Sequence, residues 1–268
     1  MLNNAKTPQT NKNAEKPKLI YTPTIMKLTS KTTIGEIVAD DFRTAAIFTK
    51  FHIDFCCKGH RTIEEVCKKR DIKESVLIEH IEKAKTSSAN QSFDYKSWTA
   101  DMIADYITKI HHRYVEEKSP IILQYLNKLC GVHGAIHPEL HEIHTIFSKT
   151  YLDLTAHMKR EELVVFPFIK KMKIAHSKGQ ELETPPFFSI ETPIATLRDD
   201  HITEGQRFKR IAALTNNYTP PINSCNTYKA AFAMLEEFDK DLKKHIHLEN
   251  NILFPKAIEL EKTFEKVL

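Results

Sequence analysis

The sequence predicts an all-α protein, a four-helix bundle preceded by a small helical N-terminal domain. Glycine is scarce, with 6 residues in 268, and so few glycines favour helices over a sandwich or a doubly wound sheet. After Trp98, apolar residues recur at helical spacing in long stretches separated by proline-containing loops. In this region the phrase His-x3-Glu-x4-Phe-Pro occurs twice, at residues 157–167 and 245–255. Long helices joined by short loops, with a repeated motif, are typical of a bundle.

The net charge of +4 comes entirely from the start of the chain. Residues 1–27 contain five lysines and one glutamate, so residues 28–268 are formally neutral. We expect residues 1–28 to be a disordered basic tail, because Asn, Lys, Thr and Pro dominate it. A nucleic-acid-binding protein carries its positive charge on a folded face, so we expect no nucleic acid partner.

Nothing in the sequence indicates a membrane or an oxidising compartment. The tail lacks the apolar segment of a secretory signal, and no apolar run reaches the roughly 20 residues that span a bilayer. The five cysteines form an odd set without the density of a disulfide scaffold, which suits reduced thiols. We therefore expect a cytoplasmic protein.

Residues 29–85 predict a small helical module that carries two adjacent cysteines. Three short helices are expected, each opening with a capping box: Thr33 to Glu36, Thr62 to Glu65 and Asp71 to Glu74. Between the first two helices lies FHIDFCCKGH, with Cys56 and Cys57. The polar stretch at 86–97 predicts a linker to the bundle at 98–268.

Within the bundle, two prolines predict helix boundaries. Ser119-Pro120 predicts a break between two helical segments. Thr192-Pro193 predicts a helix start, with the threonine as N-cap and the proline at the first helical position.

The repeated phrase places a histidine and a glutamate one helical turn apart in each copy. Residues four apart share a helix face, so His157 faces the same way as Glu161, and His245 the same way as Glu249. Two such pairs on neighbouring helices can bind two metal ions bridged by the carboxylates. A glutamate on an apolar stripe is costly unless it is paired or metal-bound. The sequence therefore predicts a di-metal site.

Each half of the bundle also offers a histidine on the preceding helix. His111 lies 46 residues before His157, and His201 lies 44 residues before the second copy of the phrase. His111 has apolar residues four positions before and after it, whereas His112 has polar ones and is predicted to face water. His247, which follows two lysines, is also predicted to be exposed. The predicted metal ligands are His111, His157, Glu161, His201, His245 and Glu249.

The donor set favours iron or manganese, with two zinc ions as an alternative. It contains nitrogen and oxygen but no thiolate, whereas soft-metal and structural zinc sites usually use cysteine. Each ion would receive two histidines and one oxygen from each bridging glutamate, and a bridging oxide or hydroxide would make five ligands. An octahedral ion would keep one position open, so we expect a reactive site that binds small molecules.

The chain resembles the iron–sulfur cluster repair di-iron proteins, also called the repair of iron centres family. The resemblance covers nearly everything after the tail. It is carried by FHIDFCCKGHRTIEEVC at residues 51–67 and, in a hemerythrin-like bundle, by RDDHITEG, HMKREELVVFP and HIHLENNILFP. It implies the same six ligands, two non-haem iron ions, a cytoplasmic location, and repair of clusters damaged by nitrosative or oxidative stress. Iron donation and nitric oxide chemistry are both proposed in the family.

The adjacent cysteines permit two interpretations. The resemblance implies a functional dithiol at Cys56 and Cys57, for redox chemistry or contact with a client protein. A buried, inert pair is the alternative, because cysteine is often a small core residue. Neighbouring cysteines are not expected to chelate one ion as a Cys-x-x-Cys motif does.

The favoured function is cluster repair, with damaged iron–sulfur proteins as partners and nitric oxide or dioxygen as small ligands. The alternative is a hemerythrin-like protein that binds or senses oxygen or nitric oxide. A dioxygen carrier is expected to use five histidines and two carboxylates, whereas four inward histidines are predicted here. The sequence leaves open whether the protein turns over a substrate, and a homodimer is compatible with it.

Overall fold

The computed structural model describes residues 26–86, 93–182 and 187–265, and it is all-helical, as predicted. The predicted tail therefore lies outside the described residues except for 26–28. Within the described ranges, no helix has both the length and the apolar character needed to cross a membrane.

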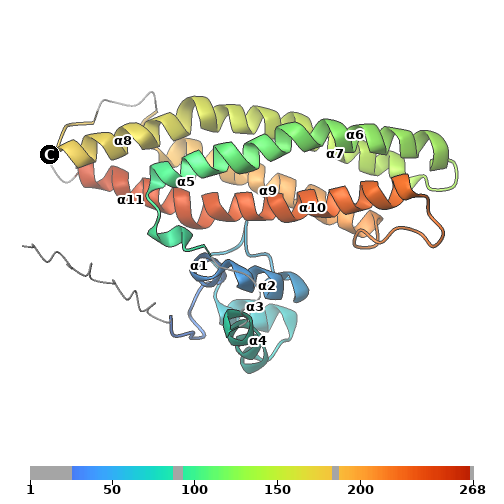
Figure 1. Ribbon diagram of the computed structural model, residues 1–268. Helices are drawn as coiled ribbons and strands as arrows, with labels where there is room; N and C mark the ends of the chain where they lie inside the picture. The colour runs from blue at the N-terminus through green and yellow to red at the C-terminus, as the bar shows by residue number, and fades with distance from the viewer. Residues whose placement is uncertain (1–25, 87–92, 183–186, 266–268) are drawn as a thin grey trace, which may run out of the picture.

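Four long rods run side by side and form the bundle (Figure 1). Three of the rods contain a π-helical segment between two α-helices, and the remaining rod is one continuous helix. In chain order the rods are α5 (Ala100–Tyr106), η3 (Ile107–His112) and α6 (Arg113–His133); α7 (Glu139–Arg160), η4 (Glu161–Val165) and α8 (Phe166–Lys178); α9 (Glu191–Leu214); and α10 (Asn226–Leu248), η5 (Glu249–Leu253) and α11 (Phe254–Glu265).

The repeated Phe-Pro accounts for two of the π-helical segments. A proline cannot donate to the carbonyl four residues earlier, and its ring clashes with that carbonyl in an α-helix. These carbonyls belong to Leu163 for Pro167 and to Asn251 for Pro255, and they lie within η4 and η5. Wider π-helical turns relieve that clash, and such turns often occur at functional sites. Each copy of the phrase thus begins its π segment at its own glutamate.

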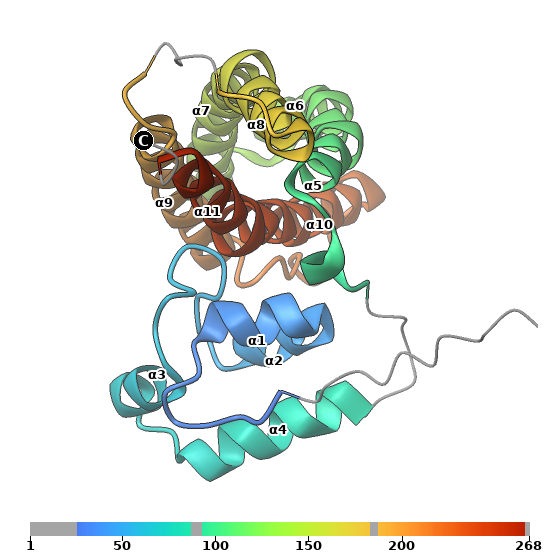
Figure 2. The same cartoon turned by 90° about the vertical axis from the view of Figure 1, so that its left-hand side faces the viewer.

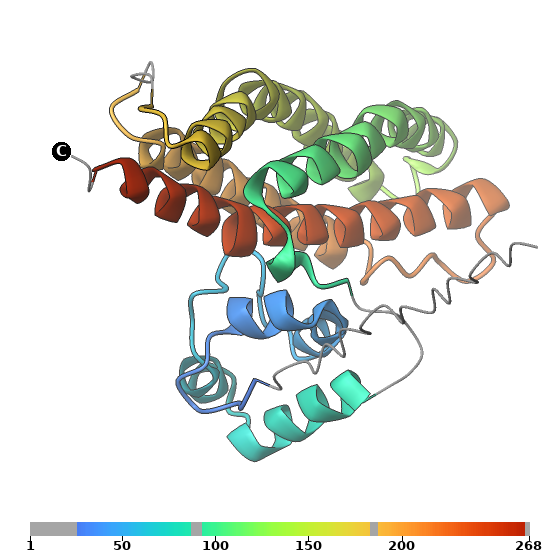
Figure 3. The same cartoon turned by 60° about the vertical axis from the view of Figure 1, so that its left-hand side comes forward.

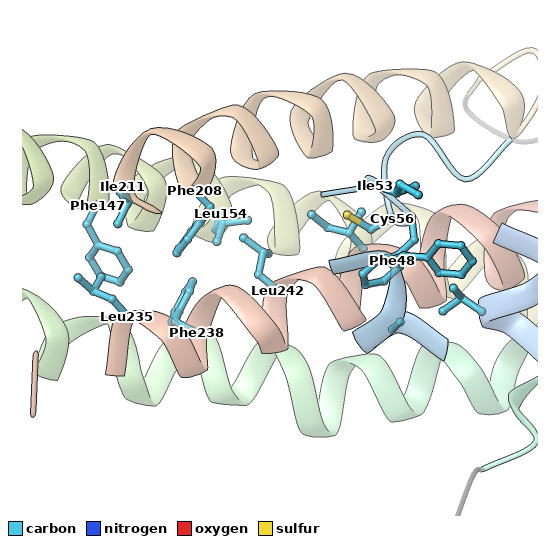
Figure 4. Close-up of a cluster of buried hydrophobic side chains, with 14 of the residues drawn as sticks. Phe48, Ile53, Cys56, Phe147, Leu154, Phe208, Ile211, Leu235, Phe238 and Leu242 are labelled. Atoms are coloured by element: carbon cyan, nitrogen blue, oxygen red, sulfur yellow. The ribbon is translucent and has the colours of Figure 1, made fainter. Parts of the chain in front are cut away.

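The rods pack through aromatic side chains at the centre of the bundle (Figure 4). Phe238 lies edge-on to Phe147, with ring centroids 5.1 Å apart, and is stacked on Phe208 at 5.6 Å. All three rings are buried. Rings in these two geometries stabilise a core beyond the area that they bury.

Both proline-based boundaries in the bundle differ from the sequence prediction. Pro120 lies inside the continuous helix α6, so no break occurs at Ser119-Pro120. The face of α6 with Ile122, Leu126 and Leu129 is buried, and this burial outweighs the roughly 3 kcal/mol cost of an interior proline. Helix α9 begins at Glu191, one residue before the predicted N-cap Thr192.

The N-terminal module contains four short α-helices that lie against one side of the bundle (Figures 2 and 3). Two predicted capping boxes are confirmed, at Thr33 with Glu36 and at Thr62 with Glu65. The third is wrong, because Asp71 ends a helix in the left-handed conformation with φ 55°. The helices are α1 (Ile34–Asp40), α2 (Ala45–Lys50), α3 (Ile63–Arg70) and α4 (Glu74–Thr86), with 3-10 turns η1 (Phe42–Thr44) and, after the gap, η2 (Tyr95–Ser97).

The module docks onto α10 and η5 around the side chain of Asn251. Its Nδ2 donates to the carbonyl oxygen of Phe55 at 3.2 Å. A Cβ atom at Gly35 or Gly59 would lie within 2.6 Å of Asn251 Oδ1, so only glycines allow this close approach. Apolar residues of the module, among them Cys56, belong to the same buried cluster as the bundle core (Figure 4). The module and the bundle therefore share one core.

Candidate metal centre

Two groups of metal-ligating side chains converge inside the bundle, and they share both bridging glutamates. One group is His112, Glu161, His245 and Glu249; the other is His157, Glu161, His201 and Glu249. In each group the ligand atoms lie within 4.8 Å of one another, and every side chain is buried. Five of the six predicted ligands are thus brought together. The sixth place is filled by His112 instead of His111.

Each glutamate faces one histidine of each group with a different oxygen. Glu161 Oε2 lies 3.2 Å from His112 Nε2, and its Oε1 lies 3.4 Å from His157 Nε2. Glu249 Oε1 lies 2.9 Å from His245 Nε2, and its Oε2 lies 3.1 Å from His201 Nε2. Ligand atoms at adjacent positions of an ion with bonds of about 2.1 Å lie about 3 Å apart. The spacing therefore fits two ions bridged by two carboxylates.

The exchange of His111 for His112 follows from the π-helical segment η3. In an α-helix the residue four after Ile107 shares its face, and that residue is His111. In a π-helical turn the residue five after it does, and that residue is His112. The prediction that His112 faces water is wrong, because both histidines are 1% exposed. His111 stacks on the ring of His245 at 5.6 Å instead of joining either group.

Hydrogen bonds to the Nδ1 atoms, on the side of each ring away from the glutamates, fix the orientation of three of the four histidines in the ligand groups. His112 Nδ1 lies 2.9 Å from Glu162 Oε1, and His157 Nδ1 lies 3.0 Å from Asp200 Oδ2. A carboxylate only accepts, so each Nδ1 carries the hydrogen and donates it. When a metal ion replaces the Nε2 proton, each of these rings is held with its Nε2 lone pair toward the two glutamates, as in metal-bound histidines.

The third of these hydrogen bonds uses an amide. His201 Nδ1 lies 3.0 Å from Asn250 Oδ1, while Asn250 Nδ2 donates to the Cys56 carbonyl. His201 Nε2 in turn lies 3.2 Å from His157 Nε2. Two ring nitrogens at this distance need either a shared proton or a metal ion that both of them bind.

Unpartnered polar atoms support the same conclusion. Both oxygens of Glu161, Glu249 Oε2 and His112 Nε2 are buried and have no hydrogen-bond partner among the described residues. Buried polar atoms without partners are costly, and a metal ion is the partner that this convergent set of nitrogens and oxygens would accept. The residues present therefore fit a pair of metal ions.

The six side chains of the two ligand groups form a metal cage, and the electrostatics of this cage also favour bound cations. Burial alone would raise the pKa of Glu249, but His245 and His201 outweigh it and hold that pKa well below its usual range. Burial alone would lower the pKa of His157, but Glu161 and Asp200 outweigh it and raise the pKa to about 10. The buried carboxylates thus stay ionised and attract positive charge, which a proton on His157 supplies until a metal ion displaces it.

A cavity of about 450 Å³ opens beside His157 and His201. Its lining includes Asp200 and Glu204, two acids for which the sequence analysis assigned no role. Glu204 is 2% exposed, and burial raises its pKa to about 7. The cavity therefore lies against two histidines of one ligand group, on one side of the centre.

The dithiol lies next to the centre. Cys57 Sγ is 3.4 Å from the backbone carbonyl oxygen of His201, and Cys56 Sγ is 3.7 Å from Cys57 Sγ. His247 lies beneath the module, with its ring 5.7 Å from Phe42 and 5.9 Å from Phe55. The prediction that His247 is exposed is therefore wrong, because it considered the bundle without the module that covers it.

Two signals in the sequence could have identified residues that were missed. His201 lies 44 residues before His245. His112 lies 45 residues before His157 and His111 lies 46 before it, so His112 matches the spacing of the second half better. The residues that hold the far ring nitrogens adjoin ligands in the sequence: Glu162 follows Glu161, Asn250 follows Glu249 and Asp200 precedes His201.

Two family models match the chain. Residues 30–85 match ScdA_N, described as a domain of unknown function. Residues 103–257 match the hemerythrin HHE cation binding domain, which contains every member of the two ligand groups.

Curated relatives match most of the chain. The iron-sulfur cluster repair protein YtfE of Musicola paradisiaca is 31% identical over 229 residues, covering 84% of this chain and 95% of that protein. The iron-sulfur cluster repair protein ScdA of Staphylococcus haemolyticus is 29% identical, covering 85% and 99%. A probable iron-sulfur cluster repair protein of Haemophilus influenzae is 31% identical over 216 residues, covering 79% and 90%.

Proposed function

This chain belongs to the family of iron–sulfur cluster repair proteins, and we propose that it repairs damaged clusters with two iron ions held in the di-metal centre. The observation that carries the proposal is the pair of buried ligand groups that share Glu161 and Glu249 and contain no thiolate. Imidazole and carboxylate donors suit iron.

In this proposal His112 and His245 hold one ion, His157 and His201 hold the other, and the two glutamates bridge them. When bound, the pair supplies redox-active iron, joined by an oxide or hydroxide, with positions open to small molecules. The residues around it orient the ligands: Glu162, Asp200 and Asn250 fix the rings of three histidines. The cavity lined by His157 and His201 admits nitric oxide or dioxygen.

The partners in this proposal are iron–sulfur proteins damaged by nitrosative or oxidative stress, and the location is the cytoplasm. The Cys56–Cys57 pair remains a predicted functional dithiol, and its position beside His201 supports a role in the exchange with such partners. An oxygen carrier is the second candidate, but only four histidines belong to the ligand groups, one fewer than such a carrier is expected to use.

The test combines metal content with repair. The purified protein should contain about two iron ions per chain and should reactivate an iron–sulfur enzyme that nitric oxide has damaged. Replacing both Glu161 and Glu249 with leucine should abolish iron binding and repair. Circular dichroism would check the fold of that variant, in which apolar side chains of similar size replace the buried carboxylates.

Two results would contradict the proposal. Full iron content in the double leucine variant would overturn the assignment of the bridging ligands. Reversible oxygen binding by the wild-type protein, without any effect on damaged clusters, would favour the oxygen-binding alternative.

A further inference from the structure

The loop between α2 and α3 brings three metal-ligating side chains together outside the di-metal centre. Asp54, Cys56 and Cys57 each offer one ligand atom, and these atoms lie within 4.8 Å of one another. Cys56 Sγ is 3.7 Å from Cys57 Sγ and 3.5 Å from Asp54 Oδ1. Both thiols are free, and Cys56 is buried while Cys57 is half-buried.

These separations match those of ligands around one tetrahedral ion. Two sulfurs bound at about 2.3 Å in tetrahedral geometry lie about 3.8 Å apart, and a sulfur and a carboxylate oxygen lie about 3.6 Å apart. Adjacent cysteines were not expected to chelate, but this loop directs both sulfurs to the same side, toward Asp54.

The surroundings hold the three ligands in place. Asp54 Oδ1 accepts a hydrogen bond from the Cys57 backbone at 3.0 Å, and Lys209 Nζ lies 3.2 Å from Asp54 Oδ2. Burial would raise the pKa of Asp54, but Lys209 and the backbone donor outweigh it and lower that pKa, so the carboxylate is ionised. A Cβ atom at Gly205 would lie 3.3 Å from Cys57 Sγ, so the glycine lets the thiol approach α9.

The cluster adjoins the di-metal centre through one direct contact and one link made by Asn250. Cys57 Sγ lies 3.4 Å from the carbonyl oxygen of His201. Asn250 links the Cys56 carbonyl, at 3.2 Å, to the His201 ring, at 3.0 Å. An ion held by the cluster would therefore lie next to His201, a member of one ligand group, on the side where the module meets the bundle.

We propose that Asp54, Cys56 and Cys57 form a mononuclear transfer site that holds one ferrous ion between the di-metal centre and a damaged cluster. This inference rests on the proposed repair function. Binding converts two thiols into two thiolates and releases two protons, and iron stays in the ferrous state. Three protein ligands leave a fourth tetrahedral position open, as in zinc sites that exchange a ligand, so a client thiolate can take the ion over.

Cobalt titration of the full-length, iron-loaded protein tests this site. Under anaerobic, thiol-free reducing conditions, Co²⁺ bound by thiolates gives a near-ultraviolet charge-transfer absorption. The two ligand groups of the di-metal centre contain no cysteine, so this absorption reports a thiolate site alone. We expect it to saturate at one Co²⁺ per chain and to disappear in the Cys56→Ser and Cys57→Ser variants.

Two further variants make the assignment specific. Asp54→Asn keeps both thiols and should weaken Co²⁺ binding at least about tenfold, which a mere dithiol would not show. Cys225→Ser removes an exposed thiol and should leave the titration unchanged. A wild-type protein without the absorption, or an absorption that follows Cys225 or ignores Asp54, overturns the transfer site.

Iron content separates this inference from the proposed function. The Cys56→Ser and Cys57→Ser variants should retain about two iron ions per chain in the di-metal centre. If the wild-type centre itself does not fill with iron, the proposed function fails. If the centre fills but the thiolate absorption is absent, only the transfer site fails.

Discussion

The two halves of the metal cage share their ligand pattern but differ in the residues directly after each bridging glutamate. In the first half Glu162 follows Glu161, and in the second Asn250 follows Glu249; each holds the Nδ1 atom of its own half's histidine. One position further, Leu163 is 73% exposed, whereas Asn251 lies between two glycines of the N-terminal module. The same framework therefore faces solvent on one side and the module on the other.

The chemistry of the side chains explains the difference. A carboxylate only accepts hydrogen bonds, so Glu162 can orient His112 and attract Lys159 but cannot bind a backbone carbonyl. An amide has both functions, so Asn250 can hold His201 while it donates to the Cys56 carbonyl. Two amides in succession thus couple the second half of the cage to the dithiol loop.

The largest expected effect concerns the histidine of the first half. His112→Ala should remove one of the two metal ions, because His112 Nε2 belongs to a ligand group. His111→Ala is the matched control, equally buried and adjacent, and should retain both ions. Iron analysis of the two variants checks this. Loss of iron in the His111 variant alone would restore the ligand set predicted from the sequence.

The exchange of His111 for His112 also marks the limit of the sequence analysis. The fold class, the capping boxes at Thr33 and Thr62, and five members of the ligand groups follow from local patterns, which helical periodicity expresses directly. Periodicity fails where the backbone leaves the α-helix, as it does in η3. It also fails at His247 and Cys57, whose surroundings come from packing between the module and the bundle.

The second prediction concerns the positions two residues after the bridging glutamates, where each half receives the residue type of the other half. Asn251→Leu should detach the module, because it leaves the carbonyl of Phe55 without its donor, removes one of two amide donors to the Cys56 carbonyl, and crowds Gly35. The expected loss of stability is about 3 to 5 kcal/mol, from the unpaired Phe55 carbonyl and overpacking. Leu163→Asn, on the exposed side, should change stability by less than about 0.5 kcal/mol. Chemical unfolding and proteolysis of the module measure the loss of stability in both variants. Equal losses in the two variants would contradict this prediction.

The third prediction interchanges acid and amide at Glu162 and Asn250, the two residues bonded to the Nδ1 atoms of His112 and His201. Glu162→Gln should weaken metal binding by about tenfold to a hundredfold, because a neutral acceptor orients His112 less strongly. Asn250→Asp should keep the metal, since its carboxylate still accepts from His201, but it loses the donor to Cys56. The first variant is therefore expected to be defective in metal affinity and the second in module docking. Identical defects in both would refute the division of roles.

The smallest expected effect concerns the position three residues after His112 in the first half and after His201 in the second half. Val115 fills it in the first half, whereas Glu204 fills it in the second, and both are buried. Burial raises the pKa of Glu204 from 4.5 to about 7, so the folded protein keeps a proton that the unfolded chain releases. Stability should therefore fall by about 2.6 kcal/mol as pH rises from about 4.5 to about 7.

Glu204→Gln removes this titration, so its stability relative to wild type should rise by that amount over the same pH range. Denaturant unfolding of the chelator-treated protein at both ends of the range measures the difference. Glu117→Gln, at an exposed glutamate, serves as the control that leaves the pH dependence unchanged. A Glu204 variant that followed the wild-type pH profile would mean that this carboxylate is ionised in the fold. The two halves of the cage would then differ in buried charge as well as in their contacts with the module.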